Sequence, residues 1–156
     1  MTVKHALYHM IANIICIIVL VGMIAFLALS WNDLPEQIPM HYDFEGNVDR
    51  YGGKASALFL PILAVVMYII ITVTERFPKS WNTGVEVNER NMEFIYNEIK
   101  DMVVTLKLMI TLLFAAISYF IFTSTTLPIW FMPVLMVAIF APIIKYGIAT
   151  SKAKKM

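Results

Sequence analysis

A short stretch, residues 38–54, carries most of the side chains that could bind a ligand or do chemistry. It places one imidazole and three carboxylates within nine positions: His41, Asp43, Glu45 and Asp49. Hard and borderline divalent cations accept such groups as ligands. The spacing matches no defined metal loop, because an EF-hand needs a run of oxygen ligands that ends in a distant Glu, and structural zinc sites use more His or Cys. A divalent metal on these four residues is therefore one hypothesis, and an ordinary hydrogen-bonded loop is the alternative.

The same stretch also offers hydrogen-bond donors for an anionic group. His41, Arg50 and Lys54 could hold a phosphate or a carboxylate, and the glycines at 52 and 53 would let backbone N–H groups approach it closely. A lipid headgroup or a peptide terminus would suit such a site. In the alternative interpretation, the two basic side chains pair with the nearby acids or extend along the membrane interface. The aromatic rings of Trp31 and Tyr51 complete the predicted ligand-binding set.

The composition of the chain shows what surrounds this stretch. Of the 156 residues, 60% are hydrophobic and only 15% are charged, and the mean hydropathy is +0.74. Soluble domains have roughly 45–50% apolar and about 25% charged residues. Four apolar runs, at about residues 10–30, 58–74, 102–122 and 129–148, are each near the ~17–25 residues that cross a bilayer. The sequence therefore predicts an all-α integral membrane protein, a single domain over residues 1–156 with four transmembrane helices.

The first apolar run fits neither a signal peptide nor a β-barrel. A cleavable signal peptide should have a basic start and a small-x-small cleavage site, whereas this run has only Lys4 before it and ends in Ser-Trp-Asn-Asp. A transmembrane β-barrel needs short segments of alternating polarity, whereas this run is apolar on every face. A spanning helix is therefore the favoured interpretation.

Lys and Arg are distributed unevenly among the segments that connect the spans. Only Arg50 and Lys54 lie between the first and second spans. The other ten lie at the termini, in the segment 75–101 or near it: Lys4, Arg76, Lys79, Arg90, Lys100, Lys107, Lys145, Lys152, Lys154 and Lys155. Because positive charge is retained on the cytoplasmic side, we expect both termini and an inner loop 75–101 in the cytoplasm, and an outer loop 31–57 outside. The localisation predicted is the bacterial cytoplasmic membrane.

The two long connections have different patterns. In the outer loop, Pro35 and Pro39 oppose helix formation and the glycines favour turns, so we expect little regular structure there. Its aromatic residues, Trp31, Tyr42, Phe44 and Tyr51, indicate an ordered loop that folds onto the membrane interface. In the inner loop, Val87, Met92, Ile95, Ile99 and Met102 recur at roughly helical spacing, which predicts an amphipathic helix that runs into the third span.

Polar residues are few within the spans. The positions are Asn13, Thr72, Lys107, Thr111, Ser118 and Lys145. We expect Lys107 and Lys145 to extend to the inner interface, and the pattern places no carboxylate deep in a span. The single cysteine, Cys16, is expected to pack as a small hydrophobic residue.

A longer pattern of residues in the first half of the chain resembles a known family. The residues that carry the resemblance are Trp31, Leu34, Pro35, Ile38, Pro39, His41, Gly46, Asp49, Lys54 and Pro61. Over about residues 11–74 the chain is similar to the small membrane domain at the N-terminus of SdpI-like immunity proteins. The resemblance implies protection of a bacterium against a membrane-active peptide toxin.

Three hypotheses for function follow. The first is a membrane protein that binds a secreted peptide toxin or an envelope ligand through its outer loop and gives immunity or envelope-stress protection. The second is a small lipid or solute transporter that works as a homo-oligomer, and the third is a metal-dependent membrane enzyme. No G-x-S-x-G, HExxH or P-loop pattern occurs, so an enzyme is the less favoured class. Membrane lipids are expected partners, and nucleic acid is not.

Overall fold

The computed structural model describes residues 6–153 and is mostly helical. Its four long helices are α1 (Ala6–Ser30), α2 (Phe59–Thr74), α3 (Met92–Phe122) and α4 (Phe131–Ala153). All four, the second extended by the 3₁₀ turn η1 (Lys54–Leu58), are long and apolar enough to cross a membrane. Lys4, Lys154 and Lys155, which contributed to the charge distribution, lie outside the described residues. The chain is thus a multi-pass membrane protein.

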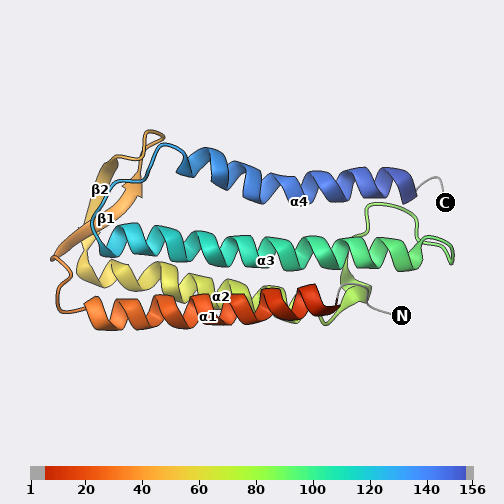
Figure 1. Cartoon of the computed structure of the whole chain (residues 1–156), viewed down its shortest axis with the longest axis horizontal. Coiled ribbons are helices and arrows are strands. Elements are labelled where there is room, and N and C mark those ends of the chain that lie inside the picture. Colours follow the sequence, from red (N-terminus) through yellow and green to blue (C-terminus); the bar gives the residue numbers. More distant parts are fainter. Residues whose placement is uncertain (1–5, 154–156) are drawn as a thin grey trace.

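The helix α3 is the centre of the bundle. Figure 1 shows α1 and α2 side by side along one flank of α3 and α4 along the other, and α3 packs against each of the three. The first turn of α1 and the last turn of α4 lie at the same end, which we call the terminal end. The opposite end carries the two strands and is called the hairpin end. Which end faces the cytoplasm stays a prediction.

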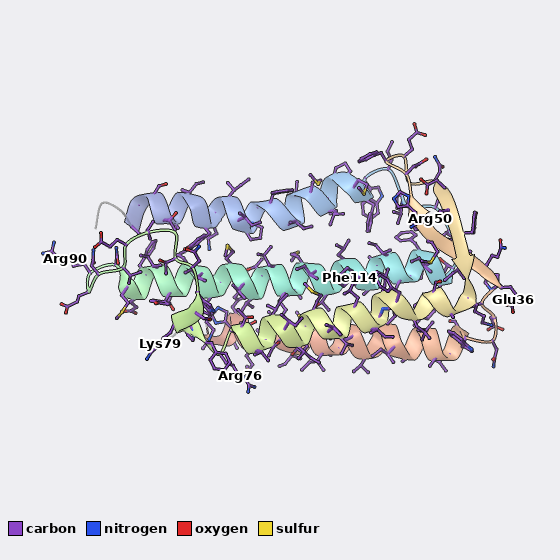
Figure 2. The ribbon with its side chains drawn as sticks, turned by 180° about the vertical axis from the view of Figure 1, so that it is seen from behind. Glu36, Arg50, Arg76, Lys79, Arg90 and Phe114 are labelled. Atoms are coloured by element: carbon purple, nitrogen blue, oxygen red, sulfur yellow. The ribbon has the colours of Figure 1, made fainter. Side chains whose placement is uncertain are left out.

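Charged side chains gather at the two ends of this bundle. Figure 2 shows Arg76, Lys79 and Arg90 at the terminal end and Glu36 and Arg50 at the hairpin end, with Phe114 midway. Phe114 packs in an apolar cluster with Leu20, Met23 and Ala64, which joins α1, α2 and α3. The fully buried Cys16 lies on α1 as well, as expected for a small hydrophobic residue. This apolar middle is what a bilayer interior requires.

The helix α3 is longer than the predicted third span. Its 31 residues extend for about 46 Å, against ~30 Å of hydrocarbon. The predicted amphipathic segment is confirmed as a helix from Met92 onward, continuous with the span, whereas Val87 lies outside it. At the terminal end its buried residues Ile95 and Ile99 pack with Ala153 of α4. Tertiary contacts with the loop and with α4 therefore cover its apolar stripe.

Four helices of the predicted kind are present, but the expectation of an all-helical fold with little regular structure in the outer loop was wrong for residues 37–53. Strand β1 (Gln37–Tyr42) pairs antiparallel with β2 (Val48–Gly53), and we call residues 37–53 the hairpin. The physical reason lies in the prolines, because the residue before a proline is driven into extended backbone. Gly46, with φ of +87°, then allows the chain to reverse. The fold class is corrected to mostly helical with one two-stranded sheet.

Candidate functional site

The hairpin is fixed to the helices by an apolar base. Ile38 of β1 is fully buried and Leu34 is 5% exposed, and both pack with Leu27 of α1 and Phe122 of α3. Trp31 and Tyr42 pack partly buried against this cluster. Tyr51 does not, because 57% of its surface is exposed. One face of the hairpin is therefore part of the core, and the other is open.

The tip of the hairpin is joined to the connection between α3 and α4. The backbone N–H of Leu127 donates to the carbonyl oxygen of Gly46 at 2.9 Å, and the hydroxyl of Tyr42 donates to the carbonyl oxygen of Thr125 at 3.2 Å. A Cβ atom at Gly46 would collide with the carbonyl oxygen of Leu127. Burial, and to a smaller extent the neighbouring Tyr51, raises the pKa of Tyr42 to about 12, so its hydroxyl keeps the proton that it donates.

Asp43 forms the turn itself. Its Oδ1 accepts hydrogen bonds from the backbone N–H groups of Asn47 and Glu45, both at 2.9 Å. The pKa of the Asp43 carboxyl lies below its usual value. The main cause is the hydrogen bond from the backbone N–H of Asn47, because it stabilises the ionised form. Glu45 Oε2 lies 3.4 Å from the side-chain nitrogen of Asn47. The acids predicted as ligands at positions 43 and 45 therefore interact with the turn.

The open face of the hairpin holds a histidine–aspartate pair. His41 Nδ1 lies 2.6 Å from Asp49 Oδ1, across strands whose register sets His41 opposite Arg50. The two side chains are 58% and 46% exposed. Lys54 Nζ lies 5.5 Å from the centre of the Trp31 ring, a cation–π distance. Of the predicted set, the structure thus joins His41 with Asp49 and Lys54 with Trp31, and leaves Arg50 and Tyr51 exposed.

The predicted metal ligands do not converge in this arrangement. Among residues 6–153, no group of three or more His, Cys, Asp or Glu side chains is close enough to hold a metal ion. His41 and Asp49 provide two donors, while Asp43 is used by the turn. A metal on these residues stays a prediction that would require the turn to rearrange.

A second polar site, which the sequence interpretation missed, lies among the helices. Lys107 of α3 is fully buried, so the expectation that it extends to the interface was wrong. Its ammonium forms an ion pair with Glu75 at the end of α2, donates to Asn13 Oδ1 of α1 at 2.5 Å and to Thr72 Oγ1 at 3.2 Å. A full set of partners explains why the side chain stays inside, since an isolated charge there would be costly.

A second buried pair adjoins this one. His9 Nε2 of α1 lies 2.7 Å from Asp101 Oδ1 of α3, and their side chains are 7% and 11% exposed. The amide nitrogen of Asn13 donates to the carbonyl oxygen of His9 at 2.8 Å, which links the two pairs. We call His9, Asn13, Thr72, Glu75, Asp101 and Lys107 the polar network. The sequence pattern places Glu75 and Asp101 at the two ends of the inner loop 75–101, outside the spans, and therefore predicts no carboxylate here.

The depth of the polar network follows from the helix rise. Lys107 lies about 22 Å along α3 from Phe122 at the hairpin end, and Asp101 about 31 Å, at about 1.5 Å per residue. Taking the hydrocarbon as ~30 Å thick from the hairpin end, Lys107 lies inside it and Asp101 at its far boundary. One signal was available in the sequence: Asn13, Thr72 and Lys107 are polar residues in three different spans, all near the same end.

Comparison with known proteins matches part of the chain to a family. Residues 17–65 match the family described as "Domain of unknown function (DUF1648)". A protein of Archaeoglobus fulgidus named "Uncharacterized protein" is 26% identical over 132 residues, covering 74% of this chain and 72% of that relative. No solved structure matches the chain.

The family match covers the hairpin and excludes the central helix. It runs from the middle of α1 through β1 and β2 into the first turns of α2. Lys107 and Asp101 of the polar network lie beyond it, on α3. The hairpin is thus the candidate site within the part of the chain that the family match describes.

Proposed function

We propose that this protein binds a peptide toxin or another envelope ligand through the open face of its hairpin and so protects a bacterial cytoplasmic membrane. One observation carries the proposal. The hairpin is held by a buried base and by the bond from Leu127 to Gly46, yet it exposes the His41–Asp49 pair and two aromatic rings. Phe44 is 89% exposed and Tyr51 57%. A rigid element with exposed aromatic anchors loses little conformational entropy on binding.

The charge of the segment indicates the kind of ligand. Between residues 31 and 57 there are five acids and two bases: Asp33, Glu36, Asp43, Glu45, Asp49, Arg50 and Lys54. This excess of negative charge favours the approach of a cationic partner. A cationic, membrane-active peptide would meet acids at the turn and the exposed ring of Phe44. The resemblance of the segment to SdpI-like immunity domains supports the same class of ligand.

Orientation is the first test, because the proposal needs the hairpin outside. A cysteine at Asn47, an exposed position in the turn, should be labelled by a membrane-impermeant thiol reagent in intact cells. The native Cys16 is buried and serves as the unlabelled background. Labelling at position 47 only after the cells are opened would exclude an outer binding site.

The binding test compares survival of a bacterium that lacks the protein with one that carries it, under a panel of cationic membrane-active peptides. Phe44→Ser and Asp49→Asn should each lose protection while the protein stays monodisperse in detergent. Lys79→Gln, at the opposite end (Figure 2), is the matched control and should protect fully. Full protection by both hairpin variants, or peptide sensitivity unchanged by the wild-type protein, would refute the proposal.

A second candidate is the small transporter, and the polar network favours it. Ionisable residues inside membrane helices commonly mark ion or proton paths. The two pairs Lys107–Glu75 and His9–Asp101 give α3 such groups. Proton or solute flux into vesicles that contain the purified protein, abolished by Glu75→Gln and unaffected by Asp49→Asn, would identify transport as the function.

A further inference from the structure

The register of the hairpin shows which backbone groups point away from its sheet. Pro39 of β1 lies opposite Tyr51 of β2, and because proline has no N–H, this pair cannot exchange two hydrogen bonds. The backbone N–H of Lys54, just after β2, donates to the carbonyl oxygen of Glu36, just before β1, at 3.0 Å. Bonded and non-bonded positions alternate along an antiparallel pair. The N–H groups of Tyr51 and Gly53 therefore point to the side of β2 that faces away from β1, which we call the outer edge.

The outer edge of β2 is open to another chain. Among the described residues, the two strands pair only with each other, and β2 packs mainly against β1. Tyr51 and Gly53 are both exposed, and the two strands lie across the end of the bundle, outside the helices (Figure 1). The opposite edge of the sheet, on β1, is interrupted by the fully buried Pro39. Proline is one means by which proteins block a sheet edge, so one edge is blocked here and the other is available for pairing.

Gly53 supports this interpretation, because nothing within the chain requires a glycine at that position. Its φ of −66° is one that any residue adopts, and a Cβ atom there would meet no other atom within 4 Å. Gly46 differs in both respects, with φ of +87° and the carbonyl of Leu127 beside it. A glycine in a strand often marks a place where another backbone approaches closely. Gly53 leaves such a bare stretch of backbone at the outer edge.

The charge of the hairpin indicates which kind of peptide the edge would select. Backbone groups pair with any extended chain, so side chains must supply the selectivity. The hairpin carries three acids, Asp43, Glu45 and Asp49, against one base, Arg50, and Glu36 adjoins it. This balance favours a peptide that carries Lys or Arg.

We propose that the outer edge of β2 binds an extended cationic peptide as a third strand of the sheet. The N–H groups of Tyr51 and Gly53 donate to carbonyl oxygens of the peptide, and the carbonyl oxygen of Tyr51 accepts from a peptide N–H. This inference rests on the peptide binding proposed for the hairpin and specifies how the backbone of the peptide is held. Side chains on the open face then contact the peptide beside this edge.

The test measures binding of a fluorescent probe, the blocked peptide Lys-Thr-Val-Lys-Val-Thr-Lys, to the full chain in a neutral detergent. Gly53→Pro removes the outward N–H and keeps the backbone angle, because proline fixes φ at about −65°. Gly53→Ala keeps the N–H and measures the effect of a side chain alone. We expect Gly53→Pro to bind the probe about fivefold more weakly than Gly53→Ala, the loss of roughly one backbone hydrogen bond. Lys79→Gln, at the terminal end, is the control outside the hairpin (Figure 2).

Two further measurements do not depend on how Gly53→Pro folds. A probe methylated on two adjacent central backbone nitrogens, one for each edge of its own strand, keeps its charges and should lose binding to the wild type. Amide hydrogen exchange followed by NMR should show the N–H groups of Tyr51 and Gly53 exchanging rapidly in the free protein and slowly with the probe. The N–H of Gly52, which faces β1, should be protected in both states.

The outcomes separate pairing at the edge from peptide binding in general. Equal binding of the two probes, or of Gly53→Pro and Gly53→Ala, would overturn pairing at the outer edge, while loss of protection in Phe44→Ser would still support binding by the open face. Failure of the wild type to bind the probe would overturn the edge proposal, and survival of cells under cationic peptides decides protection separately. A dimer of the full chain that Gly53→Pro dissociates would assign the edge to a second copy and overturn the proposal as well.

Discussion

The two ends of the bundle hold their charged side chains in opposite ways. At the hairpin, His41 and Asp49 meet at 2.6 Å with about half of each side chain exposed to solvent. In the polar network, Lys107 is fully buried and pairs with Glu75, whose side chain is 11% exposed. An exposed pair contributes about 0–1 kcal/mol, because water screens it. A buried pair can cost several kcal/mol when one partner is removed, because the other charge is left without compensation.

This difference in burial suggests that the hairpin's open face serves binding and the polar network serves folding. We expect substitutions on the hairpin's open face to cost little stability. These residues can therefore be suited to binding a ligand rather than to folding. Residues of the polar network link α1, α2 and α3, since Lys107 of α3 donates to Asn13 of α1 and to Thr72 of α2. We therefore expect the largest losses of stability in the polar network and the smallest at the hairpin's open face.

The largest effect is expected at Lys107. Lys107→Met leaves Glu75 without its ion partner and Asn13 without a donor, and should destabilise the protein by about 3–5 kcal/mol. The double variant Lys107→Met with Glu75→Gln removes both charges and should recover a large part of that loss. Thermal unfolding in detergent, run as a double-mutant cycle, measures the coupling. Additive losses in the two single variants would mean that the pair does not hold the helices together.

The hairpin's attachment should be next in sensitivity, and Gly46 is its weakest point. Gly46→Ala forces a left-handed conformation on a residue with a Cβ atom and pushes it into the carbonyl of Leu127, at a cost of roughly 1–3 kcal/mol. Gly53→Ala is the matched control, because Gly53 has φ of −66° and open space around its Cα. Limited proteolysis between β1 and β2, beside thermal unfolding, should detect the loosened tip. Equal behaviour of the two variants would show that the tip is not docked.

A smaller, pH-dependent effect is expected at Tyr42. Its pKa is raised from the usual value of 10 to about 12, so the folded state holds the proton more tightly than the unfolded state does. The stabilisation is fully present below pH 10 and is lost as the pH rises toward 12. Tyr42→Phe removes the bond to Thr125 and should cost about 0.5–1.5 kcal/mol at neutral pH. The variant should also flatten the alkaline part of the stability profile, and a profile that matches the wild type between pH 10 and 12 would exclude this role.

The smallest effect on stability should occur at the exposed pair. His41→Ala and Asp49→Asn should each change the free energy of unfolding by less than about 0.5 kcal/mol, because both side chains are largely solvated. The contrasting variant is His9→Ala, which takes the imidazole away from the buried Asp101 and should be clearly less stable. The melting temperatures of the detergent-extracted variants, compared with that of the wild type, measure these differences in stability. A loss at Asp49 as large as that at His9 would make the hairpin pair a structural element and remove the basis for a binding surface there.

Much of this protein could be predicted from its sequence because the membrane imposes strong rules. Runs of apolar residues near the length of a bilayer predicted four helices, and all four were found within a few residues at the hairpin end. The extension of α3 back to Met92 was visible in the spacing of its apolar residues. His41, Asp49, Trp31 and Lys54 were predicted as members of one site, and the structure pairs them as two contacts.

What only the tertiary structure decided was how residues far apart in the chain neutralise one another. Lys107 lies in an apolar run where a lysine ordinarily extends to the interface, and only the packing of α1, α2 and α3 supplies Asn13, Thr72 and Glu75 to hold it inside. The strands of the hairpin likewise follow from an apolar base on Leu27 and Phe122 and from Leu127, which lies far along the chain from Gly46. Local sequence sets backbone preference and polarity, whereas burial and pairing depend on neighbours that the chain brings together only when it folds.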